Sequence, residues 1–230
     1  MIRVNIVVEG QTEETFVNEV LAPALGYRGV YLTPRLLGAP GKQGGNVNYA
    51  RVRMDVSAFL KQDKQAYCTT LIDLYGLGNG FPGNDPTPIG VLRRPEPGRA
   101  SQIEQAVKSD IISTLGDNWR ADIRFIPYIQ QYEFEGLLFS DPVALAQGIS
   151  QPQLANKFQA VRVAFATPEE INDSPHTAPS KRILQIHPPY QKLLHGVLAA
   201  KKIGFGTMRR ECPRFNAWIS RLEALGTGGA

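Results

Sequence analysis

The chain has few cysteines, no long hydrophobic run and little excess charge of either sign. Its two cysteines, Cys68 and Cys212, are too few for a disulfide framework and do not have the spacing of metal ligands. No apolar run approaches the roughly 18 residues of a membrane span, and the first residues lack the pattern of a signal peptide. We therefore expect an intracellular protein, located in the cytoplasm, with no membrane partner.

The order of apolar runs and helical patterns indicates the fold class. With 230 residues, of which 43% are hydrophobic, the chain is long enough to bury a core. Apolar runs alternate with helical patterns over residues 1–150, which is typical of a parallel sheet with crossover helices. We predict an α/β, Rossmann-like domain there, with a mostly parallel sheet of about four strands flanked by helices. The expected strands are RVNIVV, GVYLTPRLL, AYCTTLIDLY and IRFIPYIQQY.

Helical periodicity and capping residues predict the remaining elements. Thr12 is expected to cap a first helix that ends before Pro23, and further helices are expected at 49–61 and 101–115. The segment EFEGLLFSDP begins a helix expected to stop near Pro142. Residues 151–230 are expected to form a helical C-terminal extension packed on the first domain, with helices in PQLANKFQAVRVAF, PPYQKLLHGVLAAKK and PRFNAWISRLEAL separated by the proline-rich TPEEINDSPHTAPSKR.

The net charge of +4 is unevenly distributed. Residues 181–230 contain nine Lys or Arg residues against two glutamates, a net charge of +7 that leaves −3 for residues 1–180. A basic region beside an acidic body is compatible with a nucleic-acid partner, although an ordinary solvated helical surface has the same composition. In the first case we expect nucleic-acid contacts from the C-terminal region and from a glycine-rich loop: Lys42, Lys201, Lys202, Arg209 and Arg210.

Acidic residues follow three of the predicted strands. Glu9 comes directly after the first strand, Asp73 ends the third, and Glu133 and Glu135 follow the fourth. The carboxyl ends of parallel strands meet at one edge of a sheet, so these carboxylates are expected to lie close together. Carboxylates that close repel one another unless divalent cations lie between them, and Mg²⁺ prefers oxygen ligands. The sequence therefore predicts a Mg²⁺ or Mn²⁺ site whose ligands are Glu9, Glu13, Asp73, Glu133 and Glu135.

Each of these acids except Glu9 also has a structural explanation. Glu13 and Glu14 would lie in a first helical turn, where the helix dipole favours acids, and the same holds for either glutamate of EFEG. Asp73 could form a turn ahead of the glycines that follow it. Glu9 follows an apolar strand and precedes a glycine, so neither capping nor the dipole explains it.

Other catalytic motifs are absent. The segment GAPGKQGG has Leu36 where a P-loop requires a glycine, so it does not indicate ATP binding. The three histidines, His176, His187 and His195, share no metal-ligand spacing. The two glutamates of EFE are too close in sequence to face each other across a sugar, and no serine lies in a nucleophile elbow.

Several of these segments resemble a known family. VVEGQTEETFV resembles the first motif of Toprim domains, in which a glutamate, here Glu9, follows strand one. Together, VEGQTEE, LIDLYG, FPG, YEFEGLLFSDP and APSKRI resemble a bacterial Toprim-like family, domain of unknown function family 4276, related to the Toprim domain of OLD (overcoming lysogenization defect) nucleases. The resemblance covers most of the chain, and it implies a role in phage defence with an ATPase partner protein.

The resemblance has one departure from the usual pattern. Toprim domains carry an Asp-x-Asp pair after the third strand, whereas Asp73 is followed by Leu74 and Tyr75. The resemblance thus leaves Glu133 or Glu135 to supply the missing ligand. A topoisomerase is not expected, because no recognisable second domain supplies an active tyrosine.

The acids and the resemblance together predict a Mg²⁺- or Mn²⁺-dependent nuclease that hydrolyses phosphodiester bonds in DNA or RNA. The alternative is a catalytically inactive sensor, or a partner subunit of an ATPase, that binds metal and nucleotide or nucleic acid. In the first reading Lys181 and Arg182 neutralise a phosphate oxygen. The sequence leaves the substrate open, and an oligomer is possible. The predicted catalytic residues are Glu9, Asp73, Glu133, Glu135, Lys181 and Arg182.

Overall fold

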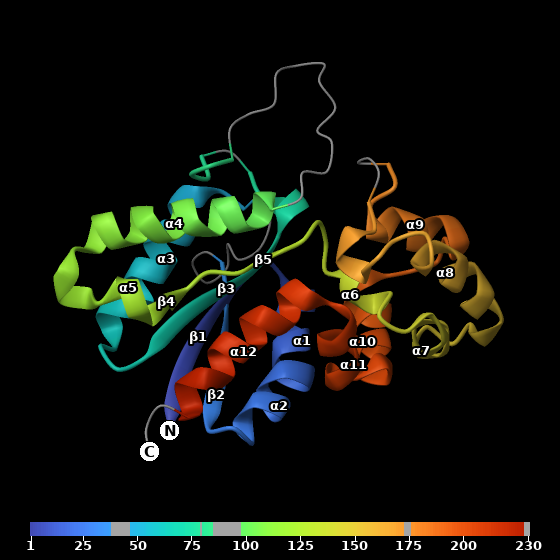
Figure 1. Cartoon of the computed structure of the whole chain (residues 1–230), viewed down its shortest axis with the longest axis horizontal. Coiled ribbons are helices and arrows are strands. Elements are labelled where there is room, and N and C mark those ends of the chain that lie inside the picture. The colour runs from blue at the N-terminus through green and yellow to red at the C-terminus, as the bar shows by residue number, and fades with distance from the viewer. Residues whose placement is uncertain (38–46, 79, 85–97, 173–175, 228–230) are drawn as a thin grey trace.

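The protein contains one parallel β-sheet with helices on both faces (Figure 1). The computed structural model describes residues 1–37, 47–78, 80–84, 98–172 and 176–227. The strand order is β2-β1-β3-β4, and β5 also pairs with β3. All these pairings are parallel, so the predicted α/β class is confirmed. The strands are β1 (Ile2–Val8), β2 (Val30–Leu36), β3 (Tyr67–Asp73), β4 (Phe125–Ile126) and β5 (Ile129–Gln130).

The single strand predicted in IRFIPYIQQY is wrong, because that segment forms two short strands. β4 pairs with the first half of β3, and β5 pairs with its end. Pro127 lies between them and has no N–H to donate to a ladder. Instead, the hydroxyl of Thr70 accepts a hydrogen bond from the Tyr128 N–H at 2.9 Å and donates one to the Tyr128 carbonyl at 2.7 Å. The Thr70 side chain thus supplies hydrogen bonds where Pro127 interrupts the backbone pairing of the strands.

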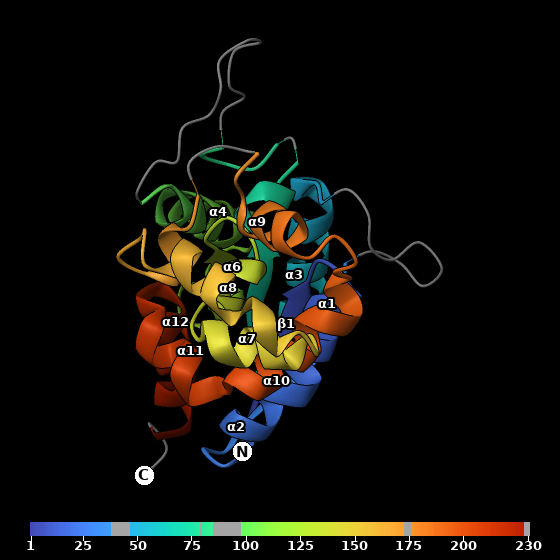
Figure 2. The same cartoon turned by 90° about the vertical axis from the view of Figure 1, so that its right-hand side faces the viewer.

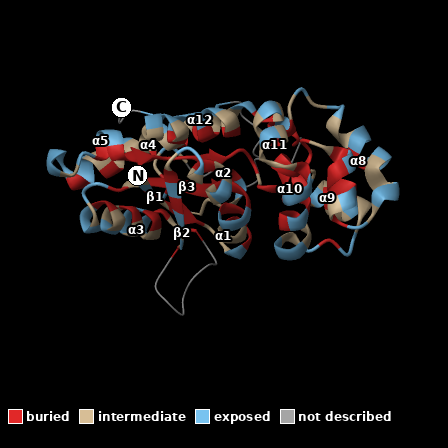
Figure 3. Ribbon diagram, turned by 90° about the horizontal axis from the view of Figure 1, so that it is seen from below, coloured by how far each residue is buried: buried red, intermediate tan, exposed pale blue. Residues whose placement is uncertain are grey.

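The helices form one layer on each face of the sheet. One layer contains α3 (Tyr49–Gln62), α4 (Arg99–Leu115) and α5 (Ala121–Arg124), and the other contains α1 (Gln11–Phe16), α2 (Ala22–Gly26) and α12 (Pro213–Thr227) (Figure 1). Side chains of β1 alternate between the two apolar cores: Val4, Ile6 and Val8 face the second layer and Val7 faces the first. Figure 3 shows the buried residues on the inner faces of these helices.

The first predicted helix does not end before Pro23. A π-helical turn, Val17–Leu21, connects α1 to α2, and Pro23 lies in the first turn of α2. A proline is tolerated there because an N–H in the first turn has no partner within the helix. The helical segment that begins at α1 therefore continues to Gly26, the last residue of α2.

The other helices gather at one end of the sheet (Figures 1 and 2). Helices α7, α9 and α11 were not predicted, and the helix expected to stop near Pro142 ends at Leu138. The helices are α6 (Glu135–Leu138), α7 (Pro142–Gly148), α8 (Ala155–Arg162), α9 (Pro179–Ile186), α10 (Val197–Ile203) and α11 (Phe205–Glu211). Short 3-10 turns lie at Leu74–Gly76, Asp117–Trp119, Pro152–Leu154 and Pro168–Glu170, and a second π-helical turn lies at Lys192–Gly196.

The C-terminal helix α12 returns to the sheet and completes its core. The ring of Trp218 stacks on Tyr128 at 4.3 Å between centroids, and its indole N–H donates to the hydroxyl of Thr69 at 2.9 Å. The domain boundary predicted at residue 150 stays a prediction. Within the described ranges, no helix has both the length and the hydropathy that a membrane crossing requires.

Candidate functional site

Three strand ends place carboxylates at one edge of the sheet. Glu9 follows the last residue of β1, and Asp73 is the last residue of β3, the neighbouring strand. Gln130, at the end of β5, pairs with Asp73 and leads into the segment that holds Glu133 and Glu135. Helix α1 begins directly after β1, so its first turn adds Glu13 at the same edge. We call Glu9, Glu13, Asp73 and Glu135 the carboxylate cluster.

One lysine connects three members of this cluster. The ammonium of Lys192 lies 3.0 Å from Oδ2 of Asp73, 3.1 Å from Oε1 of Glu13 and 3.5 Å from Oε2 of Glu135. These three carboxylate side chains are at least nine-tenths buried, whereas 36% of the Lys192 side chain is exposed. A single positive charge therefore partly neutralises several buried acids.

Backbone N–H groups hold two of the acids in place. Asp73 accepts a hydrogen bond from the N–H of Phe134 at 2.8 Å, which links the end of β3 to the start of α6. Glu133, which lies outside the cluster, accepts one from the N–H of Ser180 at 2.9 Å, in the first turn of α9. That position suits a carboxylate, because the first N–H groups of a helix lack intrahelical partners.

Three acids of the cluster have a buried oxygen that makes no hydrogen bond: Oε2 of Glu9, Oε1 of Glu13 and Oε2 of Glu135. The last two lie 3.1 and 3.5 Å from the Lys192 ammonium. A Cβ at Gly76 would lie 2.8 Å from Oε1 of Glu9, so the loop after β3 lies directly against this carboxylate. A buried carboxylate oxygen without a donor costs free energy, which indicates that a positively charged or hydrogen-bonding ligand belongs beside it.

Burial raises the pKa of several cluster members. Burial first, and then the charges of Asp73 and Glu13, raise the pKa of Glu9 from 4.5 to about 7. Burial raises the pKa of Glu135 to about 8, against the opposing effect of Lys192, and burial also raises the pKa of Glu13. Burial alone would lower the pKa of Lys192, but the three carboxylates around it raise it above its ordinary value. The lysine is therefore charged, while Glu9 and Glu135 hold protons readily near neutral pH.

Sequence reasoning missed Lys192. It lies 119 residues from Asp73 along the chain and was counted only as part of the basic C-terminal region. It begins the π-helical turn Lys192–Gly196, a rare conformation that is frequent at functional sites. No local sequence signal separates this lysine from its neighbours, because its role depends on contacts with three distant segments.

The two basic residues of APSKRI lie on α9, near the backbone that binds Glu133. Lys181 is exposed. The Nε–H of Arg182 donates to the carbonyl of Thr177 at 2.9 Å, and its guanidinium lies 5.1 Å from the centre of the Phe165 ring. The structure therefore places Lys192, and neither of these two residues, among the carboxylates.

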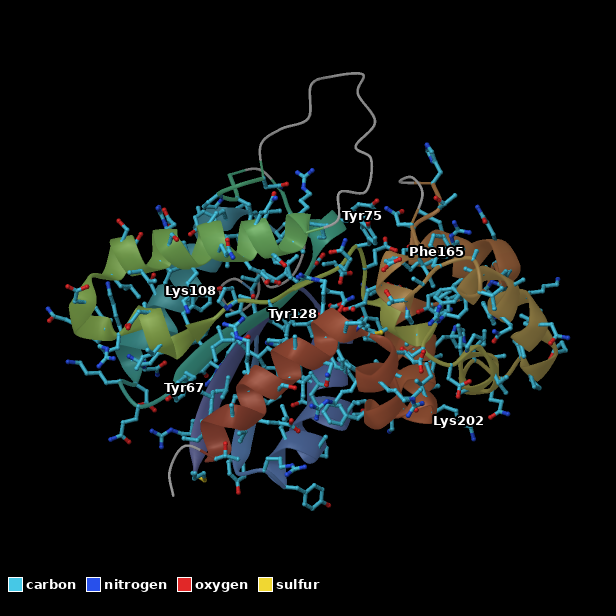
Figure 4. All side chains as sticks on the ribbon, in the orientation of Figure 1. Tyr67, Tyr75, Lys108, Tyr128, Phe165 and Lys202 are labelled. Atoms are coloured by element: carbon cyan, nitrogen blue, oxygen red, sulfur yellow. The ribbon has the colours of Figure 1, made fainter. Side chains whose placement is uncertain are left out.

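Three of the four basic residues expected on the C-terminal region are paired with acids. Lys201 lies 2.6 Å from Glu19, Arg209 lies 2.7 Å from Glu223, and Arg210 lies 3.4 Å from Glu211. Lys202 is exposed and lies well away from Tyr75, as their labels in Figure 4 show. Lys42, the remaining basic residue of the prediction, lies outside the described residues.

The cluster has the ligand chemistry of a hard divalent cation but not a ready-made geometry. Carboxylate oxygens are the ligands that Mg²⁺ and Mn²⁺ prefer. The unpartnered oxygen of Glu9 is available as a metal ligand. In the part of the chain that the structure describes, no three His, Cys, Asp or Glu side chains are arranged to hold a metal ion. The Lys192 ammonium takes the place of a cation among them.

Comparison with protein families identifies the family of the chain. Residues 8–223 match the family described as "Domain of unknown function (DUF4276)". The chain belongs to this family. The family description names no activity, so membership alone does not assign one.

Comparison with solved structures finds two structures that are only weakly similar to this one. Two structures of the C-terminal region of the Xanthomonas campestris pv. campestris OLD protein, phased with iodine and with mercury, are similar over 99% of this chain and 97% of theirs. Their sequence identities are 14% and 12%, and their TM-scores are 0.38 and 0.37. At that level the likeness carries no argument about function. The comparison with curated proteins gave no match.

Proposed function

We propose that this DUF4276 protein hydrolyses phosphodiester bonds in DNA or RNA with a divalent cation, Mg²⁺ or Mn²⁺, at the carboxylate cluster. The observation that carries the proposal is the set of buried acids from three adjacent strand ends around one ammonium. Like charges concentrated in this way are destabilising without a cation, so their presence in one place needs a functional reason. The resemblance to Toprim domains, in which a glutamate follows strand one, supports the same reading.

Each side chain has a distinct role in this proposal. Glu9, Glu13, Asp73 and Glu135 would hold the cation, with Asp73 kept in position by the N–H of Phe134. When bound, the cation would lower the pKa of a water molecule and neutralise charge on the phosphate. Lys192 would place its ammonium against a nonbridging phosphate oxygen, in place of the role that the sequence suggested for Lys181 and Arg182. Lys42 and the basic C-terminal residues would contact the strand outside the site.

A second candidate function follows from the same lysine. If the Lys192 ammonium is the permanent counter-ion of the cluster, the site needs no metal to be neutralised. Tyr75 also stands where Toprim domains carry a second aspartate. Both observations favour a catalytically inactive sensor or a partner subunit of an ATPase, which would bind nucleotide or nucleic acid without turnover.

Turnover separates the two functions. The purified protein would be incubated with plasmid, linear DNA and structured RNA, with and without Mn²⁺, alone and with a candidate ATPase partner. Metal-dependent cleavage that the Asp73→Asn variant lacks would support the hydrolase. A preparation that cleaves none of these substrates under any of these conditions would support the sensor.

A further inference from the structure

A cavity of about 520 Å³ is lined in part by Gln131 and Tyr132, which precede Glu133 in the chain. Tyr132, Phe165 and Pro213 supply most of its apolar lining, and Gln131, Asn172 and Arg214 supply polar atoms. Its size lies within the range of about 300 to 1,000 Å³ that is typical of small-molecule sites. None of the residues predicted from the sequence lines it.

Three residues that line this cavity carry a polar atom without a hydrogen-bond partner. Oε1 of Gln131, Oδ1 of Asn172 and Nε of Arg214 are buried and make no hydrogen bond. Gln131 and Asn172 are only 6% and 5% exposed. An unpartnered buried amide oxygen costs free energy, so two residues of this kind at one cavity favour a ligand with N–H donors.

The charge of the lining excludes a phosphate as that ligand. Glu169 and Glu170 line the cavity. The Nη2 atom of Arg214 lies 2.8 Å from Glu104, and its Nη1 donates to Ser101, so the guanidinium is already neutralised. The groups without a hydrogen-bond partner are two neutral acceptors and one N–H donor, a set that suits an uncharged polar ring.

Aromatic side chains supply flat surfaces for such a ring. Tyr132 and Phe165 line the cavity, and the ring of Tyr75 lies 5.5 Å from that of Tyr132 (Figure 4 labels Tyr75 and Phe165). Tyr132 has φ of 59°, in the left-handed region that a bulky residue rarely adopts. A strained aromatic residue beside unsatisfied amides is an arrangement found at binding sites.

The cavity and the carboxylate cluster share two loops. The N–H of Tyr75, two residues after Asp73, donates to the carbonyl of Tyr132 at 3.0 Å. The hydroxyl of Tyr75 also contacts the amide nitrogen of Asn172. Tyr132 directly precedes Glu133, so a ring in the cavity would lie beside the edge of the sheet where the acids meet.

We infer that this cavity binds a nucleobase, stacked on aromatic side chains and hydrogen-bonded by Gln131 and Asn172. Unstacked bases are recognised in this way, by aromatic faces and by polar groups that read their edges. The placement of the base next to a scissile phosphate rests on the proposed function, whereas binding of the base itself does not. The base could belong to a strand or to a free nucleotide.

The test is equilibrium binding in the presence of EDTA, where no metal-dependent cleavage interferes. Four probes separate the sources: adenosine, adenosine monophosphate, a short oligodeoxyadenosine, and an abasic oligonucleotide of the same length. Wild-type protein is expected to bind the oligodeoxyadenosine about tenfold more tightly than the abasic strand, since stacking of one base contributes about 1–3 kcal/mol. Adenosine monophosphate binding as tightly as the oligonucleotide would assign the site to a free nucleotide.

Two variants locate the binding. Gln131→Met removes the unpartnered oxygen and keeps the volume, so it should bind poorly while unfolding at the same or a higher urea concentration. Phe165→Leu removes a ring face and keeps an apolar side chain, which provides a second variant if the first does not fold. Gln62→Met, at an exposed position elsewhere, is the matched control.

Two results would overturn the inference. One is equal affinity of wild-type protein for the abasic strand and the oligodeoxyadenosine, with no binding of adenosine or its monophosphate. The other is loss of stability in Gln131→Met with unchanged binding, which would give Gln131 a structural role. If the protein binds bases through Gln131 but never cleaves nucleic acid, only the proposed function is contradicted. If it cleaves nucleic acid, and both variants bind the probes as wild type does, only this inference is contradicted.

Discussion

The ammonium of Lys192 lies 3.0 Å from Oδ2 of Asp73, across 119 residues of sequence. This contact connects the start of a π-helical turn to the end of the central strand β3. It also brings the lysine to Glu13 and Glu135, so that one side chain controls the charge balance of the whole cluster.

Removing the lysine should destabilise the metal-free protein. Lys192→Met leaves buried carboxylates without their counter-ion, and we expect a loss of about 2–4 kcal/mol in the free energy of unfolding at mildly alkaline pH. Urea unfolding in EDTA measures the loss. Lys202→Met is the matched control, because Lys202 is exposed on α10. Equal stabilities of the two variants would show that Lys192 is not the counter-ion of the cluster.

The same substitution should strengthen cation binding. A divalent cation and the Lys192 ammonium compete for the same carboxylates, and their like charges repel. We expect Mn²⁺ to bind Lys192→Met more tightly than wild type by about tenfold, a difference of about 1.4 kcal/mol. Calorimetric titration with Mn²⁺ measures it. Weaker binding by the variant would mean that the ammonium helps to build the metal site and does not compete for it.

The metal-free protein should lose stability as the pH rises. The pKa of Glu9 is raised to about 7 and that of Glu135 to about 8, above the 4.5 expected for the unfolded chain. The folded state therefore holds these protons more tightly. Their stabilising contribution is complete below pH 4.5 and is lost as the pH rises through 7 and 8.

Glu9→Gln should flatten this decline, because a glutamine cannot ionise. We expect the variant to exceed wild type by about 1–3 kcal/mol at alkaline pH and to match it in acid. Urea unfolding in EDTA across the pH range tests this, with Glu14→Gln, in the first turn of α1, as the control. Parallel pH profiles for wild type and Glu9→Gln would contradict the assigned pKa of Glu9.

Neutralising the basic C-terminal residues should change nucleic-acid binding less than their number suggests. Of Lys201, Lys202, Arg209 and Arg210, three already pair with glutamates, so they release fewer counter-ions on binding. We expect the slope of log affinity against log salt to fall by about 1, not by about 4, in the quadruple variant. A fall of the slope by nearly 4 would show that these ion pairs open on binding. An unchanged slope would show that the region is an ordinary solvated surface.

Local patterns predicted the sheet because its strands are continuous apolar runs bounded by glycine and charge. Glu9 and Asp73 were predicted together because the carboxyl ends of neighbouring parallel strands must meet at one edge. The division of the fourth strand was also present in the sequence, since Pro127 interrupts the run. The short helices α9 and α11 were missed because packing, more than propensity, stabilises helices of that length.

The rest of the site depends on contacts between distant segments. Lys192, Gln131 and Asn172 have ordinary neighbours in the sequence, and only the fold shows that one lies among acids and that two carry unpartnered oxygens. Glu133 shows the reverse case. Its spacing predicted a metal ligand, which stays a prediction, and the structure adds that its carboxylate accepts a hydrogen bond from the N–H of Ser180 in the first turn of α9.

The most direct test of the proposed function is the single-turnover rate of nucleic-acid cleavage in Mn²⁺ for wild type and Asp73→Asn. Asparagine keeps an acceptor for the Phe134 N–H and removes the charge that would hold the cation. Asp122→Asn, at an exposed position, is the matched control. The hydrolase predicts a folded Asp73→Asn protein whose rate falls by at least about a hundredfold, with Asp122→Asn unchanged. Cleavage by Asp73→Asn at the wild-type rate would show that the carboxylate cluster is not the catalytic site.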